Sequence, residues 1–118
     1  MFYSETSYKD EQLRANQGTT VRVENVSVKG GEMEAGTILC GTNGIYEPVT
    51  KAADANKSLV ILSADYNSTD AGVVSAFTSG SFHEKILKTG ASAVTAADFK
   101  DALRKYSIVM TEGVENND

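Results

Sequence analysis

The sequence predicts a mostly β domain of the α+β class, with a small amount of helix. Ten glycines and many Thr, Ser and Val residues in 118 favour short strands joined by turns. Several segments show strand-like alternation or short apolar runs, whereas the clearest helical periodicity lies near the carboxyl end. A chain of this length fits one domain with a modest core.

The stretch around Gly80 is the feature around which the rest of the chain is organised. Side chains alternate along residues 73–78, and neither face is fully charged, so both faces of this strand can be covered. The strand is expected to stop at Gly80 and to turn into a short amphipathic run, in which Phe82, Ile86 and Leu87 fall at helical spacing. We interpret this motif as core architecture rather than as a binding site.

An earlier strand is expected within residues 19–28, which are rich in β-branched side chains. The apolar positions change phase between Val23 and Val26, which predicts a bulge or break at residues 24–25. Residues 29–31, Lys-Gly-Gly, then predict a turn.

A hairpin is expected next. Residues 37–40 read as a buried strand, and residues 41–44, Gly-Thr-Asn-Gly, tolerate the positive φ of a tight turn. Residues 45–49 return as the partner strand. Pro48 is the only proline and cannot donate to a ladder, so this strand lies near an edge or ends there.

The middle of the chain predicts one central strand between two polar connections. Residues 51–58 read as a loop or a single helical turn, and the apolar run 59–62 reads as a central strand. Residues 65–72 form an exposed connection that contains Asp65 and Asp70. These carboxylates lack the full pattern of a calcium loop, so no metal site is expected.

The helix is expected after Thr95, which can cap it together with Asp98 at the third helical position. Its apolar face consists of Phe99, Ala102, Leu103 and Tyr106. Residues 108–110 can add a final strand, and residues 111–118 read as a solvated acidic tail.

Charge and residue usage exclude several classes of function. The formal net charge of −5 argues against a nucleic-acid partner, and no apolar run is long enough to span a membrane. Cys40, the single cysteine, is interpreted as a buried thiol, and His83, the single histidine, has no obvious catalytic partner. We therefore expect no enzyme activity, no catalytic residues and no cofactor.

The domain is expected to span residues 21–110, preceded by a flexible arm at residues 1–20 and followed by the acidic tail. The arm shows no sustained period of either 2 or 3.6. It is either simple terminal disorder or a segment that orders by adding a strand to a partner's sheet. Aromatic residues in the arm favour the second interpretation.

Five short sequence motifs, in a fixed order along the chain, resemble those of a known family. They are residues 36–39 (Gly-Thr-Ile-Leu), 44–49 (Gly-Ile-Tyr-Glu-Pro-Val), 59–62 (Leu-Val-Ile-Leu), 77–82 with Ile86 and Leu87, and the helix end at 102–104. Together they resemble the lambda D-like head decoration proteins of tailed bacteriophages. The resemblance covers roughly residues 35–110.

The resemblance implies a small β-barrel, or β-tulip-like, domain with a minor helical part. It implies a homotrimer that binds the major capsid protein on the outer surface of the virion, at the three-fold and quasi-three-fold positions of the expanded capsid. There it stabilises the shell against the pressure of packaged DNA. The resemblance further implies that the protein is made in the host cytoplasm and that its arm becomes ordered against the capsid.

The expected capsid contacts lie at the amino-terminal end. The strand-pairing segment is expected to be Thr19, Thr20, Val21, Arg22 and Val23, and the further contacts Phe2, Tyr3 and Tyr8. An alternative stays open for Val21 and Val23, which can equally begin the domain's own sheet.

A second function class is a β-sheet binding module of a phage particle, such as a fibre component that binds carbohydrate or a host surface. In that case Tyr46, Tyr66 and Asp65, which are expected in exposed loops, would contact the ligand.

Overall fold

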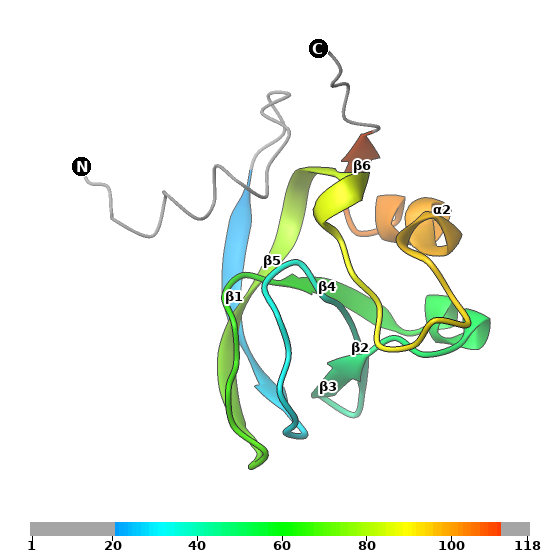
Figure 1. Ribbon diagram of the computed structural model, residues 1–118. Coiled ribbons are helices and arrows are strands. Elements are labelled where there is room, and N and C mark those ends of the chain that lie inside the picture. Colours follow the sequence, from blue (N-terminus) through cyan, green and yellow to red (C-terminus); the bar gives the residue numbers. More distant parts are fainter. Residues whose placement is uncertain (1–20, 112–118) are drawn as a thin grey trace.

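The computed structural model describes residues 21–111, and five strands in it close a small barrel (Figure 1). The barrel strands are β1 (Arg22–Val28), β2 (Ile38–Thr42), β3 (Ile45–Pro48), β4 (Ser58–Leu62) and β5 (Gly72–His83), and a sixth strand, β6 (Ile108–Thr111), lies outside the barrel. The helical elements are the 3₁₀ turns η1 (Ala52–Asn56), η2 (Glu84–Ile86) and η3 (Ala96–Phe99) and the α-helix α2 (Lys100–Arg104). The predicted mostly β class, with one short helix near the carboxyl end, is confirmed.

The barrel strands follow the order β1-β3-β2-β4-β5, and β5 pairs again with β1 to close the ring. Most neighbours are antiparallel, but β1 and β3 are parallel and pair only at Ser27 with Ile45 and at Val28 with Tyr46. The sixth strand, β6, lies outside the ring and runs parallel to the last four residues of β5. The β1–β3 and β4–β5 seams, with two paired positions each, are therefore the shortest in the ring.

The predicted hairpin between β2 and β3 is present, and its loop consists of two residues. Asn43 and Gly44 adopt φ of 55° and 83°, and these positive angles match the strand twist in a tight hairpin. Strand β3 ends at Pro48, as predicted, because proline has no N–H to continue the ladder.

Three further predictions are confirmed. The polar stretch after Thr50 contains the single helical turn η1, and residues 59–62 belong to β4, which lies between β2 and β5. Residues 108–110 belong to β6.

Two apolar clusters lie on opposite sides of the barrel wall. The inner core, inside the barrel, consists of Val28, Met33, Leu39, Val60, Leu62, Val74 and Ala76. The outer core lies between the outer surfaces of β2, β4 and β5 and the helical elements; its largest members are Ile38, Ile61, Phe77, Phe82, Phe99, Leu103 and Ile108. Strands β2 and β4 contribute to both cores, which is why their sequences are continuous apolar runs rather than alternating ones.

The helical elements and β6 gather on one side of the barrel, which we call the covered side (Figure 1). Phe77 and Phe82 lie beneath them with ring centroids 5.2 Å apart, and both are fully buried. Such aromatic pairs contribute beyond the area they bury. The burial of Phe82 and Leu87 agrees with the interpretation of this stretch as core architecture.

The prediction that the strand stops at Gly80 is wrong, because β5 continues to His83. Gly80 has a φ of 137°, a conformation that side chains disfavour, and β6 pairs with the chain from Gly80 onward. The glycine therefore bends the strand without ending it. The turn η2 begins only after His83.

The predicted break at residues 24–25 is also wrong, because β1 is continuous and its register irregularity lies between Arg22 and Val23. The change in phase has another cause. Val23 is 51% exposed, whereas Val26 and Val28 belong to or pack against the inner core. The valines thus occupy opposite faces of one continuous strand.

The predicted helix is present in a shorter form, as η3 followed by α2. The Oδ2 atom of Asp98 accepts a hydrogen bond from the Thr95 N–H at 2.9 Å, which is half of the expected capping arrangement. Phe99 and Leu103 are fully buried, as the periodicity predicts, whereas Tyr106 is 39% exposed.

Candidate functional site

The structure accounts for only part of the predicted contact segment. Thr19, Thr20, Phe2, Tyr3 and Tyr8 lie outside the described residues. Val21 is half-buried and packs against the outer core. Arg22 and Val23 belong to β1 and pair with Ser79 and Phe77 of β5, so these two residues begin the domain's own sheet.

Strand β1 is the most open strand of the ring. It pairs with β5 along its whole length but with β3 only at Ser27 and Val28. Over residues 22–26, no strand among residues 21–111 pairs with the edge of β1 that faces β3. We call this stretch the open edge of β1.

Two hydrogen bonds show which backbone groups point to the open edge. The Lys29 N–H donates to the Tyr46 carbonyl of β3 at 3.1 Å, and the Thr78 hydroxyl of β5 donates to the Arg22 carbonyl at 3.5 Å. Since successive residues of a strand point their backbone groups to opposite sides, Val23 and Asn25 point theirs in the same direction as Lys29. Their N–H and C=O groups therefore line the open edge.

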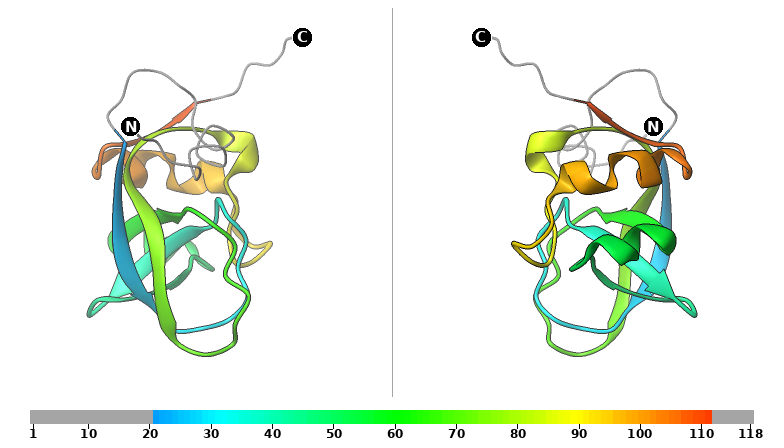
Figure 2. Two further views of the ribbon diagram at one scale, coloured as in Figure 1. Left: turned by 90° about the vertical axis from the view of Figure 1, so that its left-hand side faces the viewer. Right: turned by 90° about the vertical axis from the view of Figure 1, so that its right-hand side faces the viewer.

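The outer surface beside this edge is not covered by helices. Cross-strand pairing puts Ile45, Ser27 and Val73 in one row, with Asn25 and Ser75 in the next. Val23 lies one row further along β1. We call these six residues, Val23, Asn25, Ser27, Ile45, Val73 and Ser75, the uncovered face. Figure 2 (left) shows its β1 and β5 parts as a ribbon turned toward the viewer, with the helices behind.

The uncovered face consists of three apolar and three uncharged polar side chains. Val23, Ile45 and Val73 are 51%, 49% and 64% exposed, and the other three side chains are Asn or Ser. Beyond Ile45, at the border of this face, the Lys29 ammonium lies 3.2 Å from the Glu47 carboxylate, so these two opposite charges sum to zero. An uncharged apolar surface with a charged rim is typical of protein contact surfaces.

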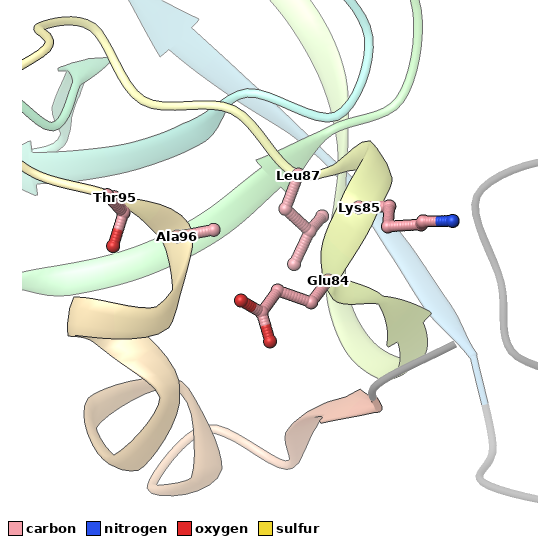
Figure 3. A pocket seen from close by; sticks show the side chains of 5 residues that line it. All are labelled: Glu84, Lys85, Leu87, Thr95 and Ala96. Atoms are coloured by element: carbon pink, nitrogen blue, oxygen red, sulfur yellow. The ribbon is translucent and has the colours of Figure 1, made fainter. Parts of the chain in front are cut away.

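A cleft of about 570 Å³ lies on the covered side between η2 and η3 (Figure 3). Leu87 and Ala96 supply its apolar wall, and the Glu84 carboxylate extends into it, while the Lys85 side chain points away. Thr95 adds a hydroxyl. One carboxylate and one hydroxyl do not make the paired acid and base of a hydrolytic site.

A second cleft, of about 370 Å³, lies beside the inner core between the loop after β1 and the chain after η2. The Lys88 ammonium and the Glu34 carboxylate are 3.8 Å apart at this cleft, and both side chains are largely exposed. Exposed pairs of this kind contribute little to stability.

Cys40 is a buried thiol, as interpreted from the sequence. Burial raises its pKa to about 11, and the nearby negative charge of Asp54 adds to the rise. The thiol is therefore protonated at neutral pH, which is unsuitable for a nucleophile. His83 is half-buried at the end of β5, with its Nδ1 atom 3.3 Å from the Thr111 hydroxyl.

Asp54 is a buried carboxylate that the sequence reasoning missed. Its Oδ2 accepts backbone N–H groups of Thr50 and Lys51 at 2.9 and 3.3 Å, and its Oδ1 lies 3.1 Å from the Lys57 ammonium. Burial opposes ionisation, but these three donors outweigh burial and lower the pKa of the Asp54 carboxyl. These contacts tie the residues before η1 to Lys57, which follows it. The signal in the sequence was an aspartate at the third position of a short alanine-rich turn.

The residues expected to bind a ligand in the second function class are engaged within the domain. The Tyr46 ring lies over Gly41, where an added Cβ would be 2.6 Å from ring carbons. The Tyr66 hydroxyl donates to the Asp70 carbonyl at 2.6 Å, and Asp65 accepts a backbone N–H from the facing loop at 2.8 Å. Each of the three therefore has a structural role.

Residues 21–111 contain no cluster of three or more side chains that could hold a metal ion. Within the same residues, no helix is long and apolar enough to cross a membrane. No protein-family model matches the sequence, and a search of curated proteins found no match.

Proposed function

We propose that this protein is a phage head decoration protein that binds the exterior of the expanded capsid as a trimer and stabilises it against packaged DNA. The observation that carries the proposal is the unpaired edge of β1 over residues 22–26. The strand that directly follows residues 1–20 has an open edge beside a surface on which Val23, Ile45 and Val73 are exposed among Asn and Ser side chains. The resemblance of residues 35–110 to the lambda D-like family supplies the identity of the partner.

Strand addition gives such a protein a way to attach. A segment that pairs with a sheet edge gains main-chain hydrogen bonds, and alternate side chains give specificity. Because one small subunit contributes only a small interface, its affinity for a shell depends on several subunits acting together. Closure of a trimer provides this multivalency, since the second and third attachments become intramolecular.

Co-sedimentation with purified capsids of the encoding phage tests the proposal. The full chain is expected to pellet saturably with expanded capsids and not with unexpanded ones, and removal of residues 1–20 is expected to abolish pelleting. A matched control that lacks residues 112–118 shortens the chain at the other end and is expected to bind normally. Absence of binding to either capsid form would contradict the proposal.

The carbohydrate-binding or host-binding module takes second place, because Tyr46, Tyr66 and Asp65 are held in contacts within the domain. Retention on a glycan array, together with failure to pellet with capsids, would favour that function instead.

A further inference from the structure

We infer that Asn43, in the two-residue loop between β2 and β3, is a site of spontaneous deamidation, which converts it to aspartate and isoaspartate. The inference goes beyond the proposed function and does not depend on it. Three observations support it, and they concern the residue after Asn43, the freedom of the reacting groups and the place of the loop in the barrel.

The first observation is the residue that follows. Asn43 is the only asparagine in the chain that precedes a glycine. Deamidation begins when the backbone nitrogen of the next residue attacks the side-chain amide carbon, and a side chain on that next residue obstructs the attack. Gly44 has no side chain, and no atom lies within 4 Å of the position where its Cβ would be. The approach to the Asn43 amide is therefore open.

The second observation is that the reacting groups are free. Asn43 and Gly44 are both exposed. Within residues 21–111, the Asn43 side chain makes no hydrogen bond, and the Gly44 N–H donates to no backbone carbonyl. Asn43 also has a φ of 55°, a conformation that side chains disfavour. Backbone rotation that brings the Gly44 nitrogen toward the amide carbon therefore relieves strain.

The reaction needs only water as a co-reactant. The Gly44 nitrogen gives its proton to a base in the solvent and forms a bond to the side-chain carbon of Asn43, whose bond to NH₂ breaks to release ammonia. Water then opens the cyclic succinimide. Addition at the side-chain carbonyl gives aspartate, and addition at the main-chain carbonyl gives isoaspartate, in which the main chain is one atom longer. Nothing is oxidised or reduced.

The third observation is the place of the loop in the barrel. The loop sets the register in which Thr42 faces Ile45. Ile45 and Tyr46 are the two residues of β3 that pair with β1 and so close the ring. An extra main-chain atom in so short a loop displaces these residues from their partners. We therefore expect the isoaspartate form to be less stable than the unmodified chain.

Peptide mapping of the full chain, after incubation in warm and mildly alkaline buffer, tests this inference. Trypsin releases residues 30–51 and 58–85 as separate peptides, in which Asn43 and Asn67 are the only asparagines. The first peptide is expected to show the mass change for replacement of NH₂ by OH and to become a substrate for isoaspartate methylation. Asn67, which is exposed but precedes a serine, is the internal control and is expected to keep its amide over the same period.

Two variants separate the modification from its effect on the fold. Asn43→Gly tolerates the same turn and has no amide, so it is expected to form no isoaspartate at this position and to keep its urea midpoint during the incubation. Asn43→Asp, measured before incubation, carries the charge of the product on an unaltered main chain. Its urea midpoint is expected to lie near that of fresh wild type, whereas the midpoint of the incubated wild type falls.

Retention of the Asn43 amide for as long as that of Asn67 would overturn the inference. An incubated wild type that contains isoaspartate at position 43 and keeps the urea midpoint of the fresh protein would contradict the expected effect on closure of the ring. Capsid co-sedimentation of the fresh protein reports on the proposed function alone, so failure of one is distinct from failure of the other.

Discussion

The two ends of β5 present the same face of one strand to very different surroundings. Phe77 is fully buried beneath the helical elements, whereas Val73, four residues earlier on the same face, is 64% exposed. The difference comes from the layer outside the barrel, which covers β2, β4 and the second half of β5 and leaves β1 and the start of β5 open. Outward apolar residues therefore stabilise the fold on one side of the barrel and are available for contact on the other.

The strands of the two sides differ in sequence accordingly. Strand β4 reads Ser-Leu-Val-Ile-Leu and is buried on both faces after its first residue. Strand β1 reads Arg-Val-Glu-Asn-Val-Ser-Val, and only Val28 is fully buried. A strand that contributes to only one core commonly has polar residues on its other face. The outward face of β1 nevertheless carries Val23.

The largest expected effect is on the covered side. Phe77→Ala is expected to lower the free energy of unfolding by about 3–5 kcal/mol, because it leaves a cavity beneath the helical elements. Val73→Ala, on the same face of the same strand, is expected to change it by less than about 0.5 kcal/mol in the separated chain. Urea unfolding at low protein concentration measures both. Equal decreases in the free energy of unfolding for the two variants would contradict the difference between the covered and uncovered sides of the barrel.

A smaller effect is expected for the buried carboxylate beside η1. Asp54→Ala is expected to cost about 1–2 kcal/mol at neutral pH, because the Thr50 and Lys51 N–H groups lose their acceptor. Asp101→Ala, which changes an exposed carboxylate on α2, is the matched control and is expected to have little effect.

The Asp54 contribution has a definite dependence on pH. The fold lowers the pKa of this carboxyl below its ordinary value of 3.8, so the folded state favours the charged form. Its stabilisation is complete above that ordinary value and is lost as pH falls through the lowered one. The difference between wild type and Asp54→Ala should therefore shrink in acid. A difference that stays constant down to the acid limit would show that the charge contributes nothing.

The smallest effect concerns Cys40, which should be almost unreactive in the folded protein. Burial raises its pKa to about 11, so little thiolate exists at pH 8, and reagents cannot reach the side chain. Thiol labelling of the wild type is expected to follow the rate of unfolding and to become fast in urea. Rapid labelling without denaturant would show that the covered side is open at β2.

The sequence allowed the fold class and the local elements to be predicted, because these depend on neighbouring residues. Residues 41–44 predicted the hairpin, and the spacing of Phe99 and Leu103 predicted the buried face of the helix. The course of β5 past Gly80 could not be predicted in this way. Its partner there is β6, which is distant in sequence, and that pairing decides whether the strand ends.

The uncovered face could not be predicted from the sequence either. Alternation put Val73 on the same face as Phe77, but it could not indicate that the helical layer covers one residue and not the other. Ile45 joins the face only because β3 pairs with β1. The open edge likewise depends on how early β1 and β3 diverge.

Thiol labelling at position 73 tests most directly whether the two ends of β5 differ in cover. Val73→Cys introduces one thiol at a position that is 64% exposed, into a chain whose own cysteine is buried, so the labelling rate reports access to this face alone. Tyr106→Cys is the control elsewhere on the surface. The folded Val73→Cys chain is expected to label without denaturant about as fast as Tyr106→Cys, while Cys40 stays unlabelled. Protection of position 73 that is lost only on unfolding would contradict the account that the start of β5 is uncovered.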